Sequence, residues 1–206
     1  ANIWLCSNRG IFKTKERGSF VLEKFGDYDS TGIPHKSIKT ICEEKNGNIW
    51  VGSTKGLTRI KRGKAGWEYK TFRHDANDPS SLSSSVITAV ATDKDDNVWV
   101  GTQSKGLNLF NKATESFVRI SKSSPGLPLI NDHIRTIKSD NKGMIWIGTQ
   151  EGVSRLNWRE KSIQNYHNDP ADKHSLSQNS VHSIFIDHNN YVWVGTFFGG
   201  INLINP

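Results

Sequence analysis

The feature that most constrains the fold is a tryptophan that recurs at nearly constant spacing along the whole chain. Five tryptophans share one local context, with β-branched or other apolar residues on both sides, as in "NIWVG" and "YVWVG". They are separated by 46, 49, 47 and 47 residues: Trp4, Trp50, Trp99, Trp146 and Trp193. Self-similarity at a fixed period of this length marks a repeat architecture, in which each repeat is one supersecondary unit. The sequence therefore predicts a chain of repeated units.

Each unit has the pattern of four short β-strands, which we name A to D. Strand A ends at an acidic residue six positions before the tryptophan, and turn-forming Asn, Asp and Gly residues separate it from strand B, which carries the tryptophan. A glycine follows the tryptophan by two positions in four units, then Ser or Thr, and a second glycine precedes strand C, as in "LNLF". Strand D is more polar, as in "SFVRI". The acidic residues, which we interpret as turn-forming, are Glu44, Asp93, Asp140 and Asp187.

These strands predict an all-β fold, a β-propeller built of four-stranded antiparallel blades. Strands A and B are apolar on both faces, which suits a sheet packed between two neighbours, whereas the polar strand D suits an outer edge. Four-stranded units of this length, with two faces to bury, stack around an axis as propeller blades. A solenoid of hairpins is the alternative. We expect the tryptophan rings to pack between blades, and the glycine two positions later to leave room for the ring.

The expected domain is a single propeller segment, residues 1–206, of about five blades. The first unit begins at strand B and the last ends at strand C, so both end blades are expected to be incomplete and the segment to be part of a larger propeller, for example a seven-bladed one. Open end blades seek partner strands, so an open arc or a strand-swapped homodimer are both alternatives. The blade units are expected at roughly 1–30, 31–78, 79–125, 126–173 and 174–206.

Charge and cysteine content restrict the partners. The net charge of +7 favours acidic partners, but the basic residues are scattered and the densest cluster is Lys61 to Lys64, so a solvated basic surface is favoured over a nucleic-acid groove. No run of about 18 apolar residues is present. Cys6 and Cys42 have neither the number nor the spacing of a zinc site, and two free thiols are favoured over a disulfide.

Candidate binding residues lie where the repeat varies. The B–C loops differ most between units, and they share one face of a propeller with the D–A loops. Basic residues there could meet carboxylates or sulfates of an acidic glycan, and aromatic residues could stack on a sugar. Polar residues of strand A, including Lys39 and Thr88, could line the channel mouth. Plain solvated turns, with the two phenylalanines covered by a neighbouring domain, are the alternative. The candidates are Arg9, Lys55, Gln103, Lys105, Gln150, Arg135, His182, Phe197 and Phe198.

Catalytic and metal sites are not indicated. The acidic residues recur in every unit, whereas catalytic carboxylates should break the repeat and converge as one pair. The segment "SDNKGMIW" does not match the sialidase box S-x-D-x-G-x-x-W, and neither a G-x-S-x-G motif nor a phosphate loop is found. The histidines belong to different units without metal-ligand spacing. The sequence therefore predicts no catalytic residue, no metal and no cofactor.

Two segments carry a family resemblance. "HDANDPSSLSSSVITAVATDKDDNVWVGTQSKGLNLFN" (74–111) and the segment 167–206 resemble the two-component regulator propeller repeat, with an Asp-Pro-rich linker, Ser-Leu-Ser, Trp-x-Gly-Thr and Gly-Leu-Asn or Gly-Ile-Asn. The resemblance extends, more weakly, over essentially the whole chain.

The resemblance implies a periplasmic sensor region of a hybrid two-component system receptor of Bacteroides-type bacteria. Such regions usually hold two seven-bladed propellers and an immunoglobulin-like domain, and they sense oligosaccharides. It therefore implies an oligosaccharide ligand, which could be acidic, and neighbouring propeller and immunoglobulin-like domains as partners. The kinase part is not in this chain, so no phosphotransfer is assigned to it. A non-catalytic protein-interaction propeller and a carbohydrate-active enzyme propeller are the alternatives.

Overall fold

The structure of the chain is a computed structural model, and it describes residues 4–7, 10–14, 22–24 and 37–205. This part of the chain is all-β, with eighteen strands in five antiparallel sheets. Among these residues we find no helix capable of crossing a membrane. The all-β class predicted from the repeated strand pattern is therefore confirmed.

Each sheet is one repeat unit, and we call the sheets blades 1 to 5. Blade 1 has three strands, which correspond to B, C and D: β1 (Trp4–Ser7), β2 (Gly10–Thr14) and β3 (Leu22–Lys24). Blade 2 comprises β4 (Ile38–Glu43), β5 (Ile49–Ser53), β6 (Gly56–Gly63) and β7 (Gly66–Phe72). Blade 3 comprises β8 (Ile87–Thr92), β9 (Val98–Thr102), β10 (Leu107–Asn111) and β11 (Ser116–Ile120). Blade 4 comprises β12 (Ile134–Ser139), β13 (Ile145–Thr149), β14 (Val153–Asn157) and β15 (Ser162–Tyr166). Blade 5 has strands A, B and C: β16 (Val181–Ile186), β17 (Val192–Thr196) and β18 (Gly200–Ile204).

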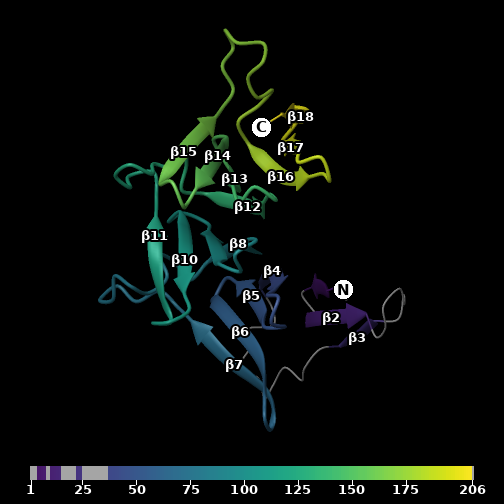
Figure 1. Ribbon diagram of the computed structural model, residues 1–206, viewed down its shortest axis with the longest axis vertical. Coiled ribbons are helices and arrows are strands. Elements are labelled where there is room, and N and C mark those ends of the chain that lie inside the picture. Colours follow the sequence, from purple (N-terminus) through teal and green to yellow (C-terminus); the bar gives the residue numbers. More distant parts are fainter. Residues whose placement is uncertain (1–3, 8–9, 15–21, 25–36, 206) are drawn as a thin grey trace.

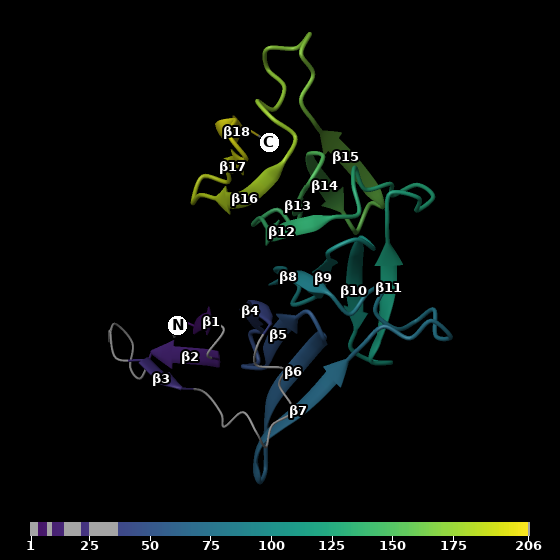
Figure 2. The same cartoon turned by 180° about the vertical axis from the view of Figure 1, so that it is seen from behind.

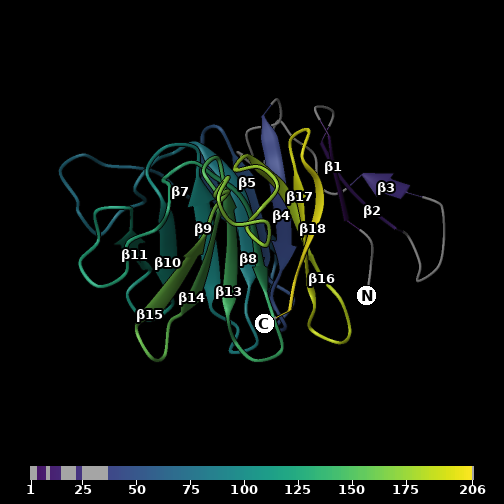
Figure 3. The ribbon, with the colours of Figure 1, turned by 90° about the horizontal axis from the view of Figure 1, so that it is seen from above.

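The blades are arranged in an arc around a common axis, and the arc is open between blades 1 and 5 (Figures 1 and 2). The A strands β4, β8, β12 and β16 line the inside of the arc and contact one another in sequence, whereas β7, β11 and β15 lie on the outside (Figure 1). Viewed perpendicular to this axis (Figure 3), the strands of the blades run between two ends of the arc, and the loops lie at these two ends. This arrangement is an incomplete β-propeller, and the alternative of a hairpin solenoid is wrong.

Three of the repeated tryptophans pack between blades, as predicted, whereas Trp193 of blade 5 is 38% exposed. Trp50, Trp99 and Trp146 are fully buried, and each belongs to a core cluster that extends into the next blade. Trp99, for example, shares its cluster with Ile134 and Ile137 of blade 4. Burial of such large side chains makes the contacts between blades a substantial source of hydrophobic stabilisation.

The glycine two positions after each tryptophan has a different role from the expected one. A Cβ atom on Gly101 would lie 2.4 Å from Cγ2 of Ile134, and one on Gly148 would lie 2.7 Å from Cγ1 of Val181. Both neighbours belong to strand A of the next blade. The expectation that this glycine makes room for the tryptophan ring was therefore wrong, because the space is taken by a β-branched residue of the following blade.

The acidic residue of each A–B hairpin has a double role. Oδ1 of Asp93 accepts hydrogen bonds from the backbone N–H groups of Asp95 and Asn97, both at 2.9 Å, which closes the turn. Oδ2 accepts from Nε1 of Trp99 at 2.9 Å. Asp140 and Asp187 repeat this arrangement. The turn-forming interpretation is confirmed, and the same carboxylate also orients the tryptophan that packs on the next blade.

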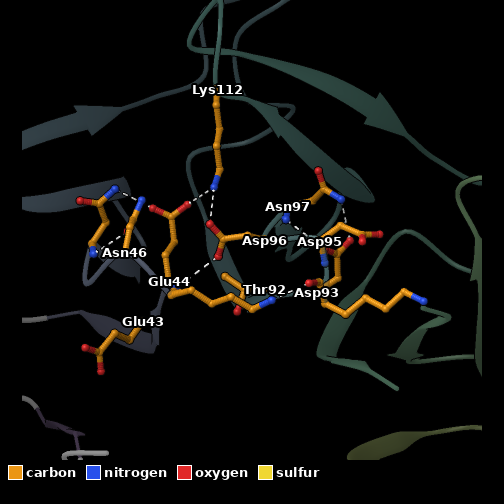
Figure 4. Close-up of polar contacts among 12 residues, drawn as sticks. Glu43, Glu44, Asn46, Thr92, Asp93, Asp95, Asp96, Asn97 and Lys112 are labelled. Atoms are coloured by element: carbon orange, nitrogen blue, oxygen red, sulfur yellow. Dashed lines mark hydrogen bonds and ion pairs between the residues drawn. The ribbon is translucent and has the colours of Figure 1, made fainter. Parts of the chain in front are cut away.

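The A–B hairpins of neighbouring blades are tied together by side chains (Figure 4). Lys112 forms ion pairs with Glu44 of blade 2 at 2.6 Å and with Asp96 of blade 3 at 2.8 Å. Nζ of Lys45 donates to the Lys94 carbonyl at 2.6 Å, and Nζ of Lys94 donates to the Lys142 carbonyl at 3.1 Å. This end of the propeller is therefore occupied by contacts that hold the blades together.

Cys42 is a free, half-buried thiol, as the sequence predicted. Burial raises its pKa, so the group is a neutral thiol at neutral pH. The side chain of Cys6 lies outside the described part of the chain.

Candidate ligand-binding face

In blades 2 to 5, one end of the blade gathers the start of strand A, the end of strand B and the start of strand C, because neighbouring strands are antiparallel. In four blades the first residue of the B–C loop donates its backbone N–H to a carbonyl just before strand A. These bonds are Thr54 to Ser37 (3.2 Å), Gln103 to Val86 (3.0 Å), Gln150 to His133 (3.2 Å) and Phe197 to Ser180 (2.8 Å). The bonds place each loop tip beside the start of the innermost strand, so both sets of predicted residues share one face.

In blades 2 to 5, a side-chain hydroxyl group closes the B–C loop. The Ser or Thr after the first repeated glycine donates its side-chain hydroxyl to the carbonyl of the second repeated glycine. The bonds are Ser53 to Gly56 (3.0 Å), Thr102 to Gly106 (2.8 Å), Thr149 to Gly152 (2.9 Å) and Thr196 to Gly200 (3.2 Å). The sequence showed this hydroxyl in every unit, but its role was missed. Because this hydrogen bond fixes the backbone of the loop, the side chains at the loop tips remain exposed. They are Lys55, Gln103, Lys105 and Gln150.

The candidates on strand A are placed by a repeated irregularity. Every A strand in blades 2 to 5 has a register shift that leaves its second residue unpaired with strand B: Lys39, Thr88, Arg135 and His182. A β-bulge redirects the side chain of its extra residue, and bulges are common beside binding sites. The bulges therefore present these four side chains at the same level of the inner strands.

Two of these side chains are tied to the next blade. Oγ1 of Thr88 donates to the carbonyl of Ile134 at 2.6 Å, and Nη1 of Arg135 donates to Oγ of Ser180 at 2.8 Å. The second bond directs the Arg135 guanidinium toward blade 5. The remaining N–H groups of a guanidinium can bind a carboxylate or sulfate in a bidentate manner.

An aromatic group lies on blade 5 at this end. The Phe197 ring stacks on His182, with centroids 5.2 Å apart and an interplanar angle of 18°, and the Phe198 ring lies 4.1 Å from Phe197. Phe198 is 93% exposed and has a φ of 60°. A bulky residue in the left-handed region is strained, and an exposed ring gains nothing from burial, so neither feature stabilises the fold.

The structure thus brings four of the nine candidates together on blades 4 and 5: Arg135, His182, Phe197 and Phe198. Lys55, Gln103 and Lys105 lie on the corresponding loops of blades 2 and 3, and Gln150 on the loop of blade 4. Arg9 lies outside the described residues. Lys39, Lys55, Lys105 and Arg135 are cationic, whereas Glu151 on the exposed B–C loop of blade 4 is anionic, so the positive charges outnumber the negative one among these side chains. Among the residues that the structure describes, no three His, Cys, Asp or Glu side chains are grouped so as to hold a metal ion.

The repeat units match a known family. The two component regulator propeller family matches four segments, each covering the A–B hairpin of one blade: residues 32–55, 81–104, 128–151 and 175–198. Four of the repeat units therefore carry the two-component regulator propeller repeat. The resemblance seen in the linkers and the Trp-x-Gly-Thr segments is therefore confirmed.

This chain spans 8% to 30% of the length of the three similar proteins named here. Histidine kinase P4 of Formosa agariphila is 33% identical over 125 residues, which are 58% of this chain and 8% of that protein. The extracellular domain of a putative hybrid two-component system from B. thetaiotaomicron has a TM-score of 0.75 and 23% identity, over 100% of this chain and 26% of that one. PorZ, a surface component of the type-IX secretion system of Porphyromonas gingivalis, has a TM-score of 0.74 and 20% identity, over 99% of this chain and 30% of that one. These structural likenesses establish the propeller fold.

Proposed function

We propose that this chain is a ligand-sensing propeller module of a hybrid two-component sensor histidine kinase/response regulator, lying on the periplasmic side of the inner membrane. The repeats themselves support this, since their family is named for two-component regulators. The named relatives support it as well: one is a histidine kinase and another is the extracellular domain of a hybrid two-component system. The module itself binds a ligand and has no catalytic role.

The proposed ligand is an oligosaccharide, and an acidic one fits best. The observation that carries this proposal is the exposed Phe198 ring, held in strained backbone beside Phe197 and His182. The apolar face of a sugar ring stacks on such an aromatic surface. Arg135, directed toward the same blade, supplies the donors for a carboxylate or sulfate.

The signal is proposed to pass through the geometry of the blades. A ligand held by Arg135 on blade 4 and by Phe198 on blade 5 would bridge two blades that are already joined by the bond from Arg135 to Ser180. Binding that fixes the angle between blades changes the position of attached domains, which are proposed to be a further propeller and an immunoglobulin-like domain. The five blades are proposed to be part of a larger ring.

Thermal-shift and calorimetric titration with neutral and acidic oligosaccharides test this function. We expect an acidic oligosaccharide to raise the melting temperature, and the double substitution Phe197→Ala with Phe198→Ala to remove the effect. Glu151→Ala, on the exposed B–C loop of blade 4, is the matched control and should leave binding intact. Absence of binding across both classes of oligosaccharide would contradict the proposal, and turnover of any of them would favour an enzyme.

A protein-interaction propeller is the second candidate. The same exposure of Phe198 favours it, since an exposed aromatic side chain can serve as the anchor of a protein interface. In that case the double phenylalanine substitution weakens binding of a neighbouring domain, measured with separately purified domains, and no oligosaccharide competes.

A further inference from the structure

The positive charge of the chain is concentrated in blade 2. Between Ile38 and Phe72, eight Lys and Arg residues stand against three Glu residues, so this blade holds +5 of the net charge of +7. Five of the eight cations lie in the hairpin of β6 and β7, where Glu68 is the only acidic residue. The hairpin is therefore a local basic surface on the outer side of this blade.

The β6–β7 hairpin extends further than the corresponding C–D hairpins of blades 3 and 4. β6 has eight residues and β7 has seven, whereas β10, β11, β14 and β15 have five each. The hairpin of blade 3 ends at the pair of Asn111 with Ser116, but the equivalent pair in blade 2 is followed by two more, which end at Gly63 and Gly66. Two residues of a strand add about 7 Å. The tip of the hairpin points away from the neighbouring blades (Figure 1), so it can reach a flat surface before they do.

The tip of this hairpin combines cations with an aromatic ring. Arg62 and Lys64 are exposed, and the guanidinium carbon of Arg62 lies 5.9 Å from the centroid of the Trp67 ring. Trp67 itself is 39% exposed. Lys61 pairs with Glu68 at 3.0 Å, so its charge is compensated. The tip therefore presents the two remaining cations and the indole ring to its surroundings.

Two other cations of the hairpin have a structural role that the tip cations lack. Arg59 and Lys70 bind the carboxylate of Glu115 and thereby join blade 2 to blade 3. Within the described part of the chain, the side chains of Arg62 and Lys64 form neither a hydrogen bond nor an ion pair. Their charges are therefore available to a partner.

A membrane surface with anionic phospholipids fits this tip better than a polymer does. Lys and Arg keep their charged ends in water while their aliphatic stems lie along apolar material, and tryptophan favours the boundary between water and the membrane. Anionic lipids attract basic segments that lie close to the surface. A single-stranded nucleic acid is bound along a basic groove, whereas this tip is a convex turn of two residues, Lys64 and Ala65. A stable protein interface needs about 20–30 residues from each partner, far more than the tip provides.

We propose that the tip of the β6–β7 hairpin, residues 61–67, binds the surface of a membrane that contains anionic phospholipids. Arg62 and Lys64 lie at the level of the lipid phosphates, and the ring of Trp67 enters the headgroup region. Strand order places the C–D turns at the end of the blades opposite to the B–C loops, so this contact leaves the candidate ligand-binding face open to solvent. The site is separate from the proposed oligosaccharide site, and either can fail without the other.

Co-sedimentation of the purified 206-residue chain with lipid vesicles tests the site. The probe vesicles contain phosphatidylcholine and phosphatidylglycerol in equal parts, and vesicles of phosphatidylcholine alone are the reference. We expect the chain to sediment with the anionic vesicles and to be released as the salt concentration rises, because salt screens the attraction. Equal binding to both kinds of vesicle, or binding to neither, would overturn the proposal.

Two triple variants, each of which removes three positive charges at exposed positions, locate the contact. The hairpin variant should bind anionic vesicles at least about tenfold more weakly, whereas the control variant, changed at lysines of other loops, should bind like the original chain. The hairpin variant is Lys61→Gln, Arg62→Gln and Lys64→Gln, and the control variant is Lys122→Gln, Lys142→Gln and Lys173→Gln. Equal losses in the two variants would show that only the net charge matters, against the proposal.

Two further measurements separate a membrane from other anions. Trp67→Ala should bind anionic vesicles about threefold more weakly or worse, and Trp67→Phe, which keeps an aromatic ring, should bind more tightly than Trp67→Ala. If Trp67→Ala binds as the original chain does, the proposed insertion of the ring is overturned. Titration with polyglutamate tests an acidic polypeptide as the partner: binding that depends on the hairpin cations, without binding to vesicles, would assign the tip to an acidic protein and overturn the proposal.

Discussion

Within the described part of the chain, the buried indole N–H of Trp50 has no hydrogen-bond partner, although the acidic residue of its own hairpin, Glu44, occupies the position from which an aspartate bonds the tryptophan in blades 3, 4 and 5. The Glu44 side chain is one methylene longer. Its Oε2 accepts instead from Nδ2 of Asn48 at 2.7 Å, and its Oε1 pairs with Lys112 at 2.6 Å (Figure 4). Glu44 thus forms an ion pair with Lys112 of the next blade instead of a hydrogen bond with Trp50.

Glu44→Asp is expected to stabilise the chain by about 1 kcal/mol. The shorter carboxylate can accept a hydrogen bond from Nε1 of Trp50. A hydrogen bond to a buried N–H group stabilises the folded state by more than a partly exposed ion pair with Lys112 does. Urea unfolding followed by tryptophan fluorescence measures the change. In the Trp50→Phe background, which has no indole N–H, the same substitution should gain nothing, and an equal gain there would show that the cause lies elsewhere.

Gly148→Ala is expected to destabilise the chain by about 1–3 kcal/mol, because the new methyl group would overlap Cγ2 of Thr136 in its own blade and Cγ1 of Val181 in the next blade. Gly195→Ala is the matched control. It occupies the same motif position in blade 5, but its new methyl group meets only the hydroxyl of Ser183, an exposed side chain that can rotate. We expect it to change stability by less than about 0.5 kcal/mol. Similar losses for the two variants in thermal unfolding would contradict the stacking role of this glycine.

The sequence was sufficient to predict the propeller because the residues that indicate each blade lie close together in the sequence. Residues close together in the sequence determine the spacing of the tryptophans, the hairpin after each strand A and the polar strand D. The differences between the loop tips of the units can be read directly from the sequence. The candidate face was predictable for the same reason, since strand order alone decides which loops share an end.

Contacts between units were not predictable in this way. The role of Gly101 depends on Ile134, 33 positions later, and the bonds of Arg119 to the loop before strand A depend on how that loop folds. One signal was available and missed: the two units with Ser-Leu-Ser in the linker also have the Asn of strand C that holds it, Asn108 and Asn202. The bulge that redirects Arg135 and His182 leaves no trace in the pattern of apolar residues.

Glu115 is expected to make stability depend on pH between about 4.5 and 2. Hydrogen bonds from Lys70 and Arg59 of blade 2 lower its pKa from 4.5 to about 2. A carboxylate with a lowered pKa in the folded state stabilises the chain above pH 4.5, and this contribution is lost as the pH falls toward 2.

The variant Glu115→Gln should therefore be less stable than the original chain at neutral pH, with a difference that shrinks on acidification and in high salt. Denaturant unfolding on both sides of pH 4.5 measures this. Glu160→Gln, at an exposed glutamate on the equivalent turn of blade 4, is the control for the loss of one negative charge. If the difference in stability between Glu115→Gln and the original chain did not change with pH, the ion pairs of Glu115 would be ruled out as its source.

Phe198→Asn is expected to stabilise the chain and to weaken ligand binding at the same time. Asparagine tolerates a φ of 60° better than phenylalanine does, and the ring it replaces is 93% exposed, so the backbone strain is relieved with little loss of burial. We expect a gain of about 0.5–1 kcal/mol in thermal unfolding. The oligosaccharide titration should lose affinity, because the exposed ring of the stacking surface is gone. A variant that gained stability and kept full affinity would place the sugar contact away from Phe198, and a variant that lost stability would mean that Phe198 has a structural role.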